Sequence, residues 1–105
     1  MINFEDFQKL NLKVARILNA ERIEDSDKLM KLEIDIGDEK RQLVAGIAKA
    51  YTSDELEGRE IIVVANLEPK EIFGLQSQGM LLAADSDQPV LLKPDDEVEP
   101  GTVIT

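Results

Sequence analysis

The segment from residue 30 to residue 36 constrains the fold most, because apolar and charged residues alternate in it without a break. Its apolar positions are Met30, Leu32, Ile34 and Ile36. A period of two places these side chains on one face of a β-strand and the charged ones on the other. Gly37 to Lys40 forms a tight connection, after which Arg41 to Ala45 is expected to pair back as a hairpin. The sequence therefore predicts an antiparallel sheet with one buried face.

The segment before this hairpin predicts a short helix and a long strand. Asn3 is a suitable cap for a helix over Phe4 to Leu10. Leu12 to Ala20 is typical of a strand, although its apolar spacing breaks strict alternation. A bulge near Ala15 would bring its apolar residues inward, as happens where a strand bends around a small barrel.

The segment after the hairpin predicts a helical interruption and then further strands. Thr52 to Gly58 indicates a capped helical turn that a glycine ends. Arg59 to Ala65 is β-branched and apolar on both faces, which is typical of a central strand. Met80 to Ala84 predicts the next strand. Two short strands are expected in the tail, near Val90 to Leu92 and near Thr102 to Ile104.

Together these elements favour an all-β fold. Five or more short strands with one helical interruption between the third and the fourth are typical of a five-stranded barrel of the oligonucleotide-binding type, the OB-fold. The N-terminal helix and the short strands of the tail would be additions to this barrel. On periodicity alone, a β-sandwich and an SH3-like barrel remain alternatives. With 105 residues, the chain is expected to form one domain over residues 1–105.

Composition excludes several kinds of site. The chain has no cysteine for a disulfide or a thiolate-bound metal, and no histidine, the commonest general base and metal ligand. Catalysis would depend on carboxylates, lysines and hydroxyls, so we expect neither an enzyme nor a cofactor or metal site. The chain contains no run of 18 apolar residues and no signal-peptide pattern at its N-terminus, so a cytoplasmic protein without a membrane span is expected.

The net charge of −10 argues against nucleic acid as a partner, because an acidic surface repels phosphate. The charge is distributed unevenly along the chain, however. Between Lys9 and Lys31, six basic residues stand against four acidic ones. From Asp85 to Thr105, six acidic residues stand against Lys93 alone. The N-terminal third is therefore compatible with an anionic partner.

The fifteen residues from Asn66 to Met80 separate two apolar runs. A connection of this length is functional or disordered more often than it is a simple turn. Ile72, Phe73 and Leu75 argue against disorder because of their apolar area. The amide, hydroxyl and glycine residues of the segment suit contacts to RNA, or alternatively cap the backbone of a packed crossover. Phe73 is expected to anchor this loop to the core rather than to stack on a base.

Six blocks of the sequence, in order and without a large gap, resemble one known family. They are Phe4–Phe7 (FEDF), Leu12–Ile17 (LKVARI), Ser26–Leu29 (SDKL), Leu43–Ile47 (LVAGI), Val64–Leu67 (VANL) and Ser77–Leu82 (SQGMLL). The chain is similar to the tRNA-binding domain that is appended C-terminally to methionyl-tRNA synthetases and also occurs as a free-standing protein. The resemblance implies an OB-fold, a homodimer, and binding of tRNA by shape rather than by anticodon sequence, in support of the synthetase. Whether the chain is a free protein, a subunit or part of a longer synthetase stays open.

Ten residues are candidates for contact with tRNA. They are Lys13, Arg16, Lys28, Lys31, Asn66, Lys70, Ser77, Gln78, Gly79 and Met80. Arginine suits a bidentate phosphate contact and lysine a point charge, whereas the loop residues would meet sugar or base edges. The structural alternatives are basic side chains at the barrel rim, a cross-strand ion pair for Lys31, capping roles for Asn66 and Ser77, and a core position for Met80.

Two features depart from the family. Glu68 and Glu71 flank Pro69 and Lys70 where typical members are basic, and the whole chain is acidic. Fewer phosphate contacts lower both the affinity and its salt dependence, so we expect a weak auxiliary site that works when doubled or tethered. Two other functions remain open: a dimeric, chaperone-like peptide-binding protein of the same fold, and a purely structural dimerisation domain of the synthetase.

Overall fold

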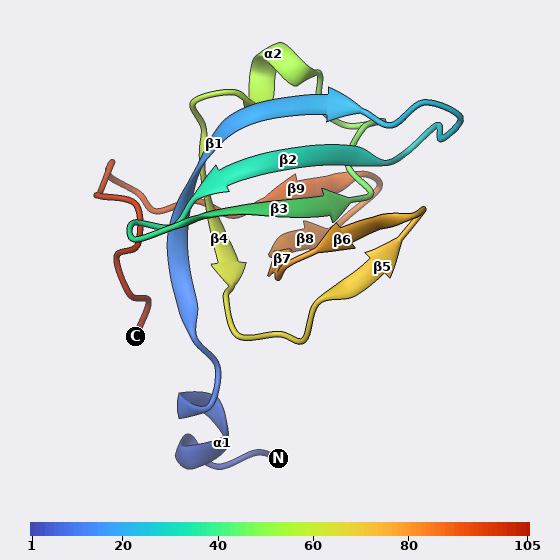
Figure 1. Ribbon diagram of the computed structural model, residues 1–105. Helices are drawn as coiled ribbons and strands as arrows, with labels where there is room; N and C mark the ends of the chain where they lie inside the picture. The colour runs from blue at the N-terminus through green and yellow to red at the C-terminus, as the bar shows by residue number, and fades with distance from the viewer.

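Strand β1 is the central element of the fold, because its first and second halves pair with two different strands. The computed structural model describes residues 1–105. The sheet consists of β1 (Leu12–Arg22), β2 (Met30–Asp35), β3 (Lys40–Ala45), β4 (Glu60–Val64) and β7 (Met80–Leu81), in the order β3-β2-β1-β4-β7. The first half of β1 pairs antiparallel with β4 and the second half with β2. The sheet curls into a nearly closed barrel, which confirms the predicted five-stranded OB-type fold (Figure 1).

The remaining elements extend this barrel. They are α1 (Phe4–Gln8), α2 (Ser53–Leu56), the hairpin of β5 (Lys70–Ile72) and β6 (Leu75–Ser77), and the pair β8 (Ala83–Asp85) and β9 (Pro89–Leu91). The N-terminal helix, the helical insertion between β3 and β4 and the tail strand expected near Val90 to Leu92 are thus confirmed. The expected strand near Thr102 to Ile104 is reduced to a single bridge between Lys13 and Val103. Neither helix is long and apolar enough to cross a membrane.

The bend of β1 lies later in the strand than the sequence predicts. Ala15 pairs in regular register with Ile61, and the irregularity falls between Ile17 and Asn19. Here the strand exchanges one neighbour for another, since the backbone of Ile17 bonds to Gly58 and Arg59 just before β4 begins. The bulge therefore forms where β1 leaves β4, and not within the segment that β4 holds in register.

Hydrogen bonds outside the main sheet close the barrel. On the free edge of β3, the Gln78 N–H donates to the Gln42 carbonyl at 2.8 Å, and the Val44 N–H donates to Ser77 Oγ at 3.1 Å. The C-terminal segment lies along the start of β1, where the Val14 N–H donates to the Thr102 carbonyl at 2.9 Å. These contacts satisfy backbone groups that an open sheet would leave exposed at its edges.

The core fills the barrel with aliphatic side chains. Met30, Leu32 and Ile34 of β2 are at most 1% exposed, which confirms the predicted alternation of this strand. All five residues of β4 are buried, as expected for a central strand. The sixteen residues of the core cluster come from every strand of the sheet, from Leu56 of α2, from Leu91 of β9 and from the connections that follow β2 and β3. This core holds the connections between strands in fixed positions.

The predicted irregular loop from Asn66 to Met80 is wrong in one respect, because most of it is a β-hairpin. Phe73 and Gly74 form its two-residue turn with φ values of 53° and 81°. Two positive φ values are typical of a type I′ turn, whose twist matches that of the flanking strands. The strand predicted over Met80 to Ala84 is also interrupted, because the Leu82 N–H donates back to Ile62 and separates β7 from β8.

Candidate functional site

Four of the ten predicted residues meet in one cavity of about 400 Å³ beside the hairpin. Lys70 of β5, Ser77 of β6, Gly79 and Met80 line it together with Leu67 and Glu68 from the connection that follows β4. Lys70 is exposed and makes no ion pair, whereas Met80 is half-buried against the core. Glu68 brings a carboxylate into the same cavity, so its net charge is small.

Ser77 and Gly79 build the wall of this cavity. Ser77 is 2% exposed, and its hydroxyl accepts from the Val44 N–H at 3.1 Å and donates to the Gly79 carbonyl at 3.0 Å. Gly79 has a φ of +124°, and a Cβ there would lie 2.8 Å from the Val64 carbonyl oxygen. The hydroxyl therefore donates its one hydrogen bond to, and accepts one from, backbone groups, and the glycine is required by the close approach to β4.

Asn66 and Gln78 also use their amides within the chain. Asn66 accepts from the Asn11 N–H at 2.8 Å and donates to the Lys9 carbonyl at 2.7 Å, which ties the end of β4 to the start of β1. Gln78 Oε1 accepts from the Gln42 N–H at 3.0 Å. Gln78 lines a neighbouring cavity of about 300 Å³ that also includes Arg41. In the structure, the side chains of Asn66 and Ser77 both hydrogen-bond to backbone groups, as the capping alternative predicts.

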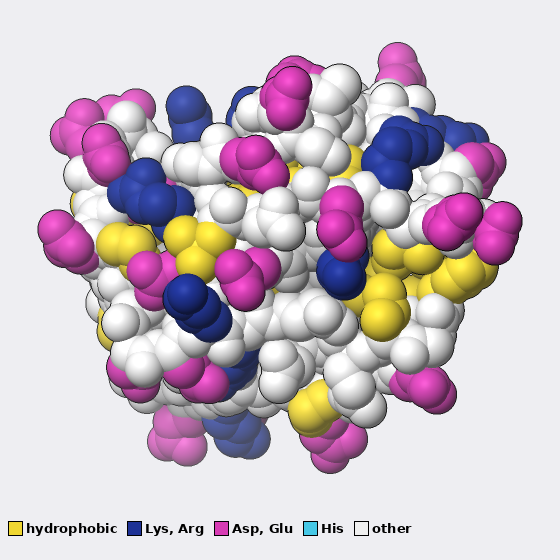
Figure 2. Space-filling view, turned by 45° about the horizontal axis from the view of Figure 1, so that its top comes forward, with side chains coloured by type: hydrophobic (Ala, Val, Ile, Leu, Met, Phe, Trp, Pro, Cys, Tyr) yellow, Lys and Arg dark blue, Asp and Glu magenta, His cyan; other side chains and the backbone are white.

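Lys31 lies on the side of the barrel where the β1–β2 connection meets the β5–β6 hairpin, and Lys28 belongs to the same connection, with its side chain beside Gly46. A cavity of about 260 Å³ lies between the β1–β2 connection and the hairpin and is lined by Glu21, Arg22, Ile23, Glu24, Lys31 and Leu75. Lys31 pairs with its cross-strand partner Glu21 at 3.0 Å, whereas Lys28 is exposed and has no ion pair. Basic, acidic and hydrophobic side chains lie together at the right of the molecule in Figure 2, the side to which both connections extend in Figure 1.

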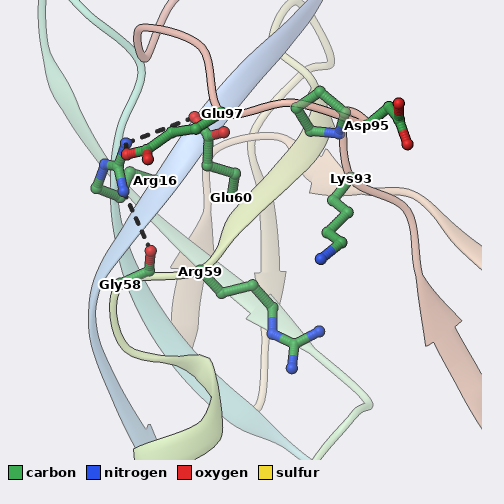
Figure 3. A pocket seen from close by; sticks show the side chains of 8 residues that line it. Arg16, Gly58, Arg59, Glu60, Lys93, Asp95 and Glu97 are labelled. Carbon is green, nitrogen blue, oxygen red and sulfur yellow. Dashed lines mark hydrogen bonds and ion pairs between the residues drawn. The ribbon is translucent and has the colours of Figure 1, made fainter.

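Arg16 lies elsewhere, in a cluster of charged residues between β1, the start of β4 and the C-terminal segment (Figure 3). Its guanidinium donates to the Gly58 carbonyl at 3.2 Å and to Glu97 at 2.9 Å, and lies 3.6 Å from Glu60. Glu60 is 9% exposed, and its second oxygen accepts from the Val98 N–H at 3.1 Å. Arg16 thus neutralises a buried carboxylate and fastens the C-terminal segment. Lys13, on the same strand, makes no ion pair.

Sequence reasoning missed several residues on the side where the two connections meet. Arg22 holds the β1–β2 connection through the carbonyls of Ala48 and Asp27, at 2.8 and 3.0 Å. Leu75 reaches the same connection from the hairpin. The available signal was weak, because Gly74 follows Phe73 and not the asparagine or aspartate that marks a two-residue hairpin turn.

One carboxyl has a displaced pKa, and it lies outside these cavities. The backbone N–H and hydroxyl of Thr52 hydrogen-bond to Glu55 and lower its pKa. Glu55 and Thr52 form the capping box of α2, so this shift reports a helix cap and not a reacting group.

Comparison with known proteins agrees with this geometry. The sequence profile of the family described as "Putative tRNA binding domain" matches residues 12–103. A methionine–tRNA ligase from Archaeoglobus fulgidus is 56% identical over 102 residues, which are 96% of this chain and 16% of the ligase. The chain therefore spans about a sixth of the length of that relative.

Two solved structures share the whole fold. A MetRS related protein from Pyrococcus horikoshii has a TM-score of 0.93 and 37% identity, over 100% of this chain and 98% of that one. The chaperone CsaA from Bacillus anthracis has a TM-score of 0.91 and 35% identity, over 100% and 99%. The family profile covers most of the chain and the similarity extends over both sequence and fold. The chain belongs to the tRNA-binding domain family.

Proposed function

We propose that this chain is a non-catalytic tRNA-binding module that assists methionyl-tRNA synthetase. One observation carries the proposal: the β1–β2 connection and the β4–β7 connection, which contains the hairpin, meet at a shared cavity. In OB-folds, these two connections and the face of the second and third strands bind oligonucleotides. Membership of the family and the identity to a methionine–tRNA ligase support the same function.

The RNA backbone would contact three lysines on this side. Lys28 and Lys70 are exposed and make no ion pair, and Lys31 is paired only with Glu21, itself half-exposed. In β5, alternation places Lys70 and Ile72 on one face and Glu71 on the opposite face, where it pairs with Gln76. Glu71 therefore opposes phosphate binding less than its position in the sequence suggests. Arg16 is left out because two carboxylates already occupy its guanidinium.

Few cations also mean a modest dependence on salt. Each phosphate neutralised by a lysine contributes about −0.9 to the slope of log K against log salt on a duplex. Three lysines therefore predict a slope of about −2 to −3. Such a module would bind the RNA backbone weakly and without sequence preference. It would be useful when joined to a partner that holds the same tRNA.

Titration of this chain with unmodified tRNA across a salt series tests the function. We expect binding at low salt, a slope of about −2 to −3, and several-fold weaker binding for the double variant Lys28→Ala/Lys70→Ala. The matched control is Lys40→Ala/Lys93→Ala, which removes the same charge from two other unpaired lysines. Absence of binding at low salt, or equal losses in both double variants, would reject the proposed surface.

We also propose that the module is a homodimer joined around α1. No residue of α1 is buried, and its Phe4 is 69% exposed. Leu10 and Val103 are exposed beside it, and a cavity of about 250 Å³ is lined by Phe4, Phe7, Gln8, Leu10, Val103, Ile104 and Thr105. An apolar patch built from both ends of the chain suits a second copy of itself, since a two-fold contact covers both patches at once.

A second candidate function is binding of peptides as a dimeric chaperone. The observation that favours it is the close match to the chaperone CsaA over the whole chain. The cavity between Leu67 and Met80 would then receive an apolar side chain. The salt dependence of binding distinguishes the two functions. A peptide-binding module would still bind unfolded polypeptide at high salt, where contacts to RNA phosphates are lost. A dimer that binds neither ligand would be the structural dimerisation domain.

A further inference from the structure

Phe73 contradicts the expected role of an anchor for the loop. Its side chain is 57% exposed at the tip of the β5–β6 hairpin. The tip is open, because a Cβ added to the adjacent Gly74 would meet nothing within 4 Å. The apolar residues that do face the barrel are Ile72 and Leu75, which pair across the hairpin and are half-buried. The hairpin is therefore anchored by its inner face, and the aromatic ring is left in solvent.

The backbone makes this exposure more informative. Phe73 has a φ of 53°, in the left-handed region that bulky residues avoid. Type I′ turns favour asparagine, aspartate or glycine at this position, so phenylalanine is a poor choice for forming the turn. The ring is neither packed in the core nor favourable for the local backbone. A contact outside the chain would account for both features.

The surroundings of the tip favour a ligand that is both planar and anionic. The cavity of about 260 Å³ between the β1–β2 connection and the hairpin combines the apolar side chains of Ile23 and Leu75 with two cations and two carboxylates, Arg22, Lys31, Glu21 and Glu24. Lys31 is paired with Glu21, so the free cation near the hairpin is Lys70. Lys70 lies on the face of β5 that carries Ile72. An unpaired nucleotide has a flat base for an aromatic ring and a phosphate for a lysine. A fully paired stem offers the phosphates but keeps its bases stacked inside.

We propose that Phe73 stacks on an unpaired base of the bound RNA while Lys70 holds a neighbouring phosphate. This inference rests on the proposed RNA-binding function and assigns to it a preference for single-stranded ends and loops over paired stems. The lysines then supply phosphate contacts that depend neither on the base sequence of the RNA nor on whether its bases are paired. The aromatic ring at the tip supplies the contact that only an unstacked base can make.

The variant Phe73→Asn separates binding from folding. Asparagine followed by Gly74 is a favoured type I′ pair, so the thermal midpoint should stay equal or rise. Affinity for an RNA hairpin with an unpaired 3′ tail should fall by about 5- to 150-fold, the range for loss of one base–aromatic stack. Affinity for a blunt duplex of the same stem should not change. Val90→Asn, at a 50% exposed position on β9, is the matched control for losing an exposed apolar side chain.

A second variant reports the contact directly. The chain contains no tryptophan, so Phe73→Trp places the only indole of the protein at the tip, where it can be excited apart from Tyr51. Tailed RNA should quench its emission and blunt duplex should not, because only an unstacked base can lie against the indole. If Phe73→Asn binds tailed RNA as tightly as the wild type, or Phe73→Trp is not quenched, the inference is overturned while RNA binding stands. If the wild type binds neither RNA, the proposed function fails and the inference with it.

Discussion

Gly79 illustrates how one residue fixes the position of the candidate site. It combines a φ of +124° with a Cβ position only 2.8 Å from the Val64 carbonyl oxygen. Ser77, two residues earlier, donates its hydroxyl to the Gly79 carbonyl and accepts from β3. The segment therefore lies between β3 and β4 because it has no side chain at its closest approach. This contact places the hairpin and Met80 at the edge of the barrel.

Replacing Gly79 by alanine should destabilise the fold through two separate effects. The positive φ costs about 1–2 kcal/mol for a residue with a Cβ, and the contact with Val64 adds about 1–3 kcal/mol of steric strain. Gly58→Ala is the matched control, because Gly58 has a φ of +86° but nothing within 4 Å of its Cβ position. Urea unfolding of both variants would measure the difference. Equal losses would mean that contact with β4 contributes nothing.

Residue chemistry alone allowed two roles for most of the ten predicted residues. Amides and hydroxyls in a long connection serve equally well as ligand donors or as caps, and the choice depends on which backbone groups come near. The partners of Asn66 are at Lys9 and Asn11, more than fifty positions away, and no local pattern announces them. The same holds for Arg16, whose partner Glu97 lies in the tail.

At the scale of elements, strands were predicted well where the pattern of apolar residues shows which side chains are buried. They were predicted poorly where a turn or a single backbone hydrogen bond sets the end of the strand. The alternation of β2 and the uniform burial of β4 follow directly from their sequences. The β5–β6 hairpin was missed because its turn carries phenylalanine where a type I′ turn favours asparagine. The break between β7 and β8 was missed because it depends on a backbone bond from Leu82 to Ile62.

The capping box of α2 predicts a pH dependence of stability. Hydrogen bonds from Thr52 lower the pKa of Glu55 in the folded state, so its stabilisation is present above the unfolded pKa. This stabilisation is lost as the pH falls through the folded pKa. Glu55→Ala should therefore lower the thermal midpoint at pH 7, and the difference from wild type should shrink in acid.

The matched control for that experiment is Asp54→Ala. Asp54 also lies in the first turn of α2 and interacts with the same helix terminus, but only Glu55 completes the capping box. Calorimetry between pH 7 and pH 3 on both variants isolates the hydrogen bonds from the general charge effect. A difference for Glu55→Ala that is independent of pH would contradict the assignment.

At the scale of the whole molecule, composition and architecture point in different directions. The net charge of −10 argues against RNA, and six ordered blocks of sequence nevertheless identified the family. The fold relieves part of this conflict by dividing the charges among different sides. Arg16 is paired with Glu97 of the acidic tail and with Glu60 in one cluster, whereas the unpaired Lys28 and Lys70 belong to the connections on which the RNA surface is proposed. Such a division depends on topology and is invisible to a count of charges.

The apolar patch around α1, built from both ends of the chain, predicts the oligomeric state. If a second copy covers the patch around α1, Phe4→Glu should place a charge in an apolar contact and convert the dimer to a monomer. Sedimentation velocity measures this directly, and Leu92→Glu, a 43% exposed position away from α1, is the matched control. A monomer presents one RNA surface instead of two, so the apparent affinity for a tRNA that spans both should fall about 10-fold or more, while affinity for a short tailed hairpin stays the same. If the Phe4→Glu variant still sediments as a dimer, the dimer interface lies elsewhere on the molecule. If the wild type is a monomer, the proposed homodimer is wrong and the exposed face of α1 contacts a different partner.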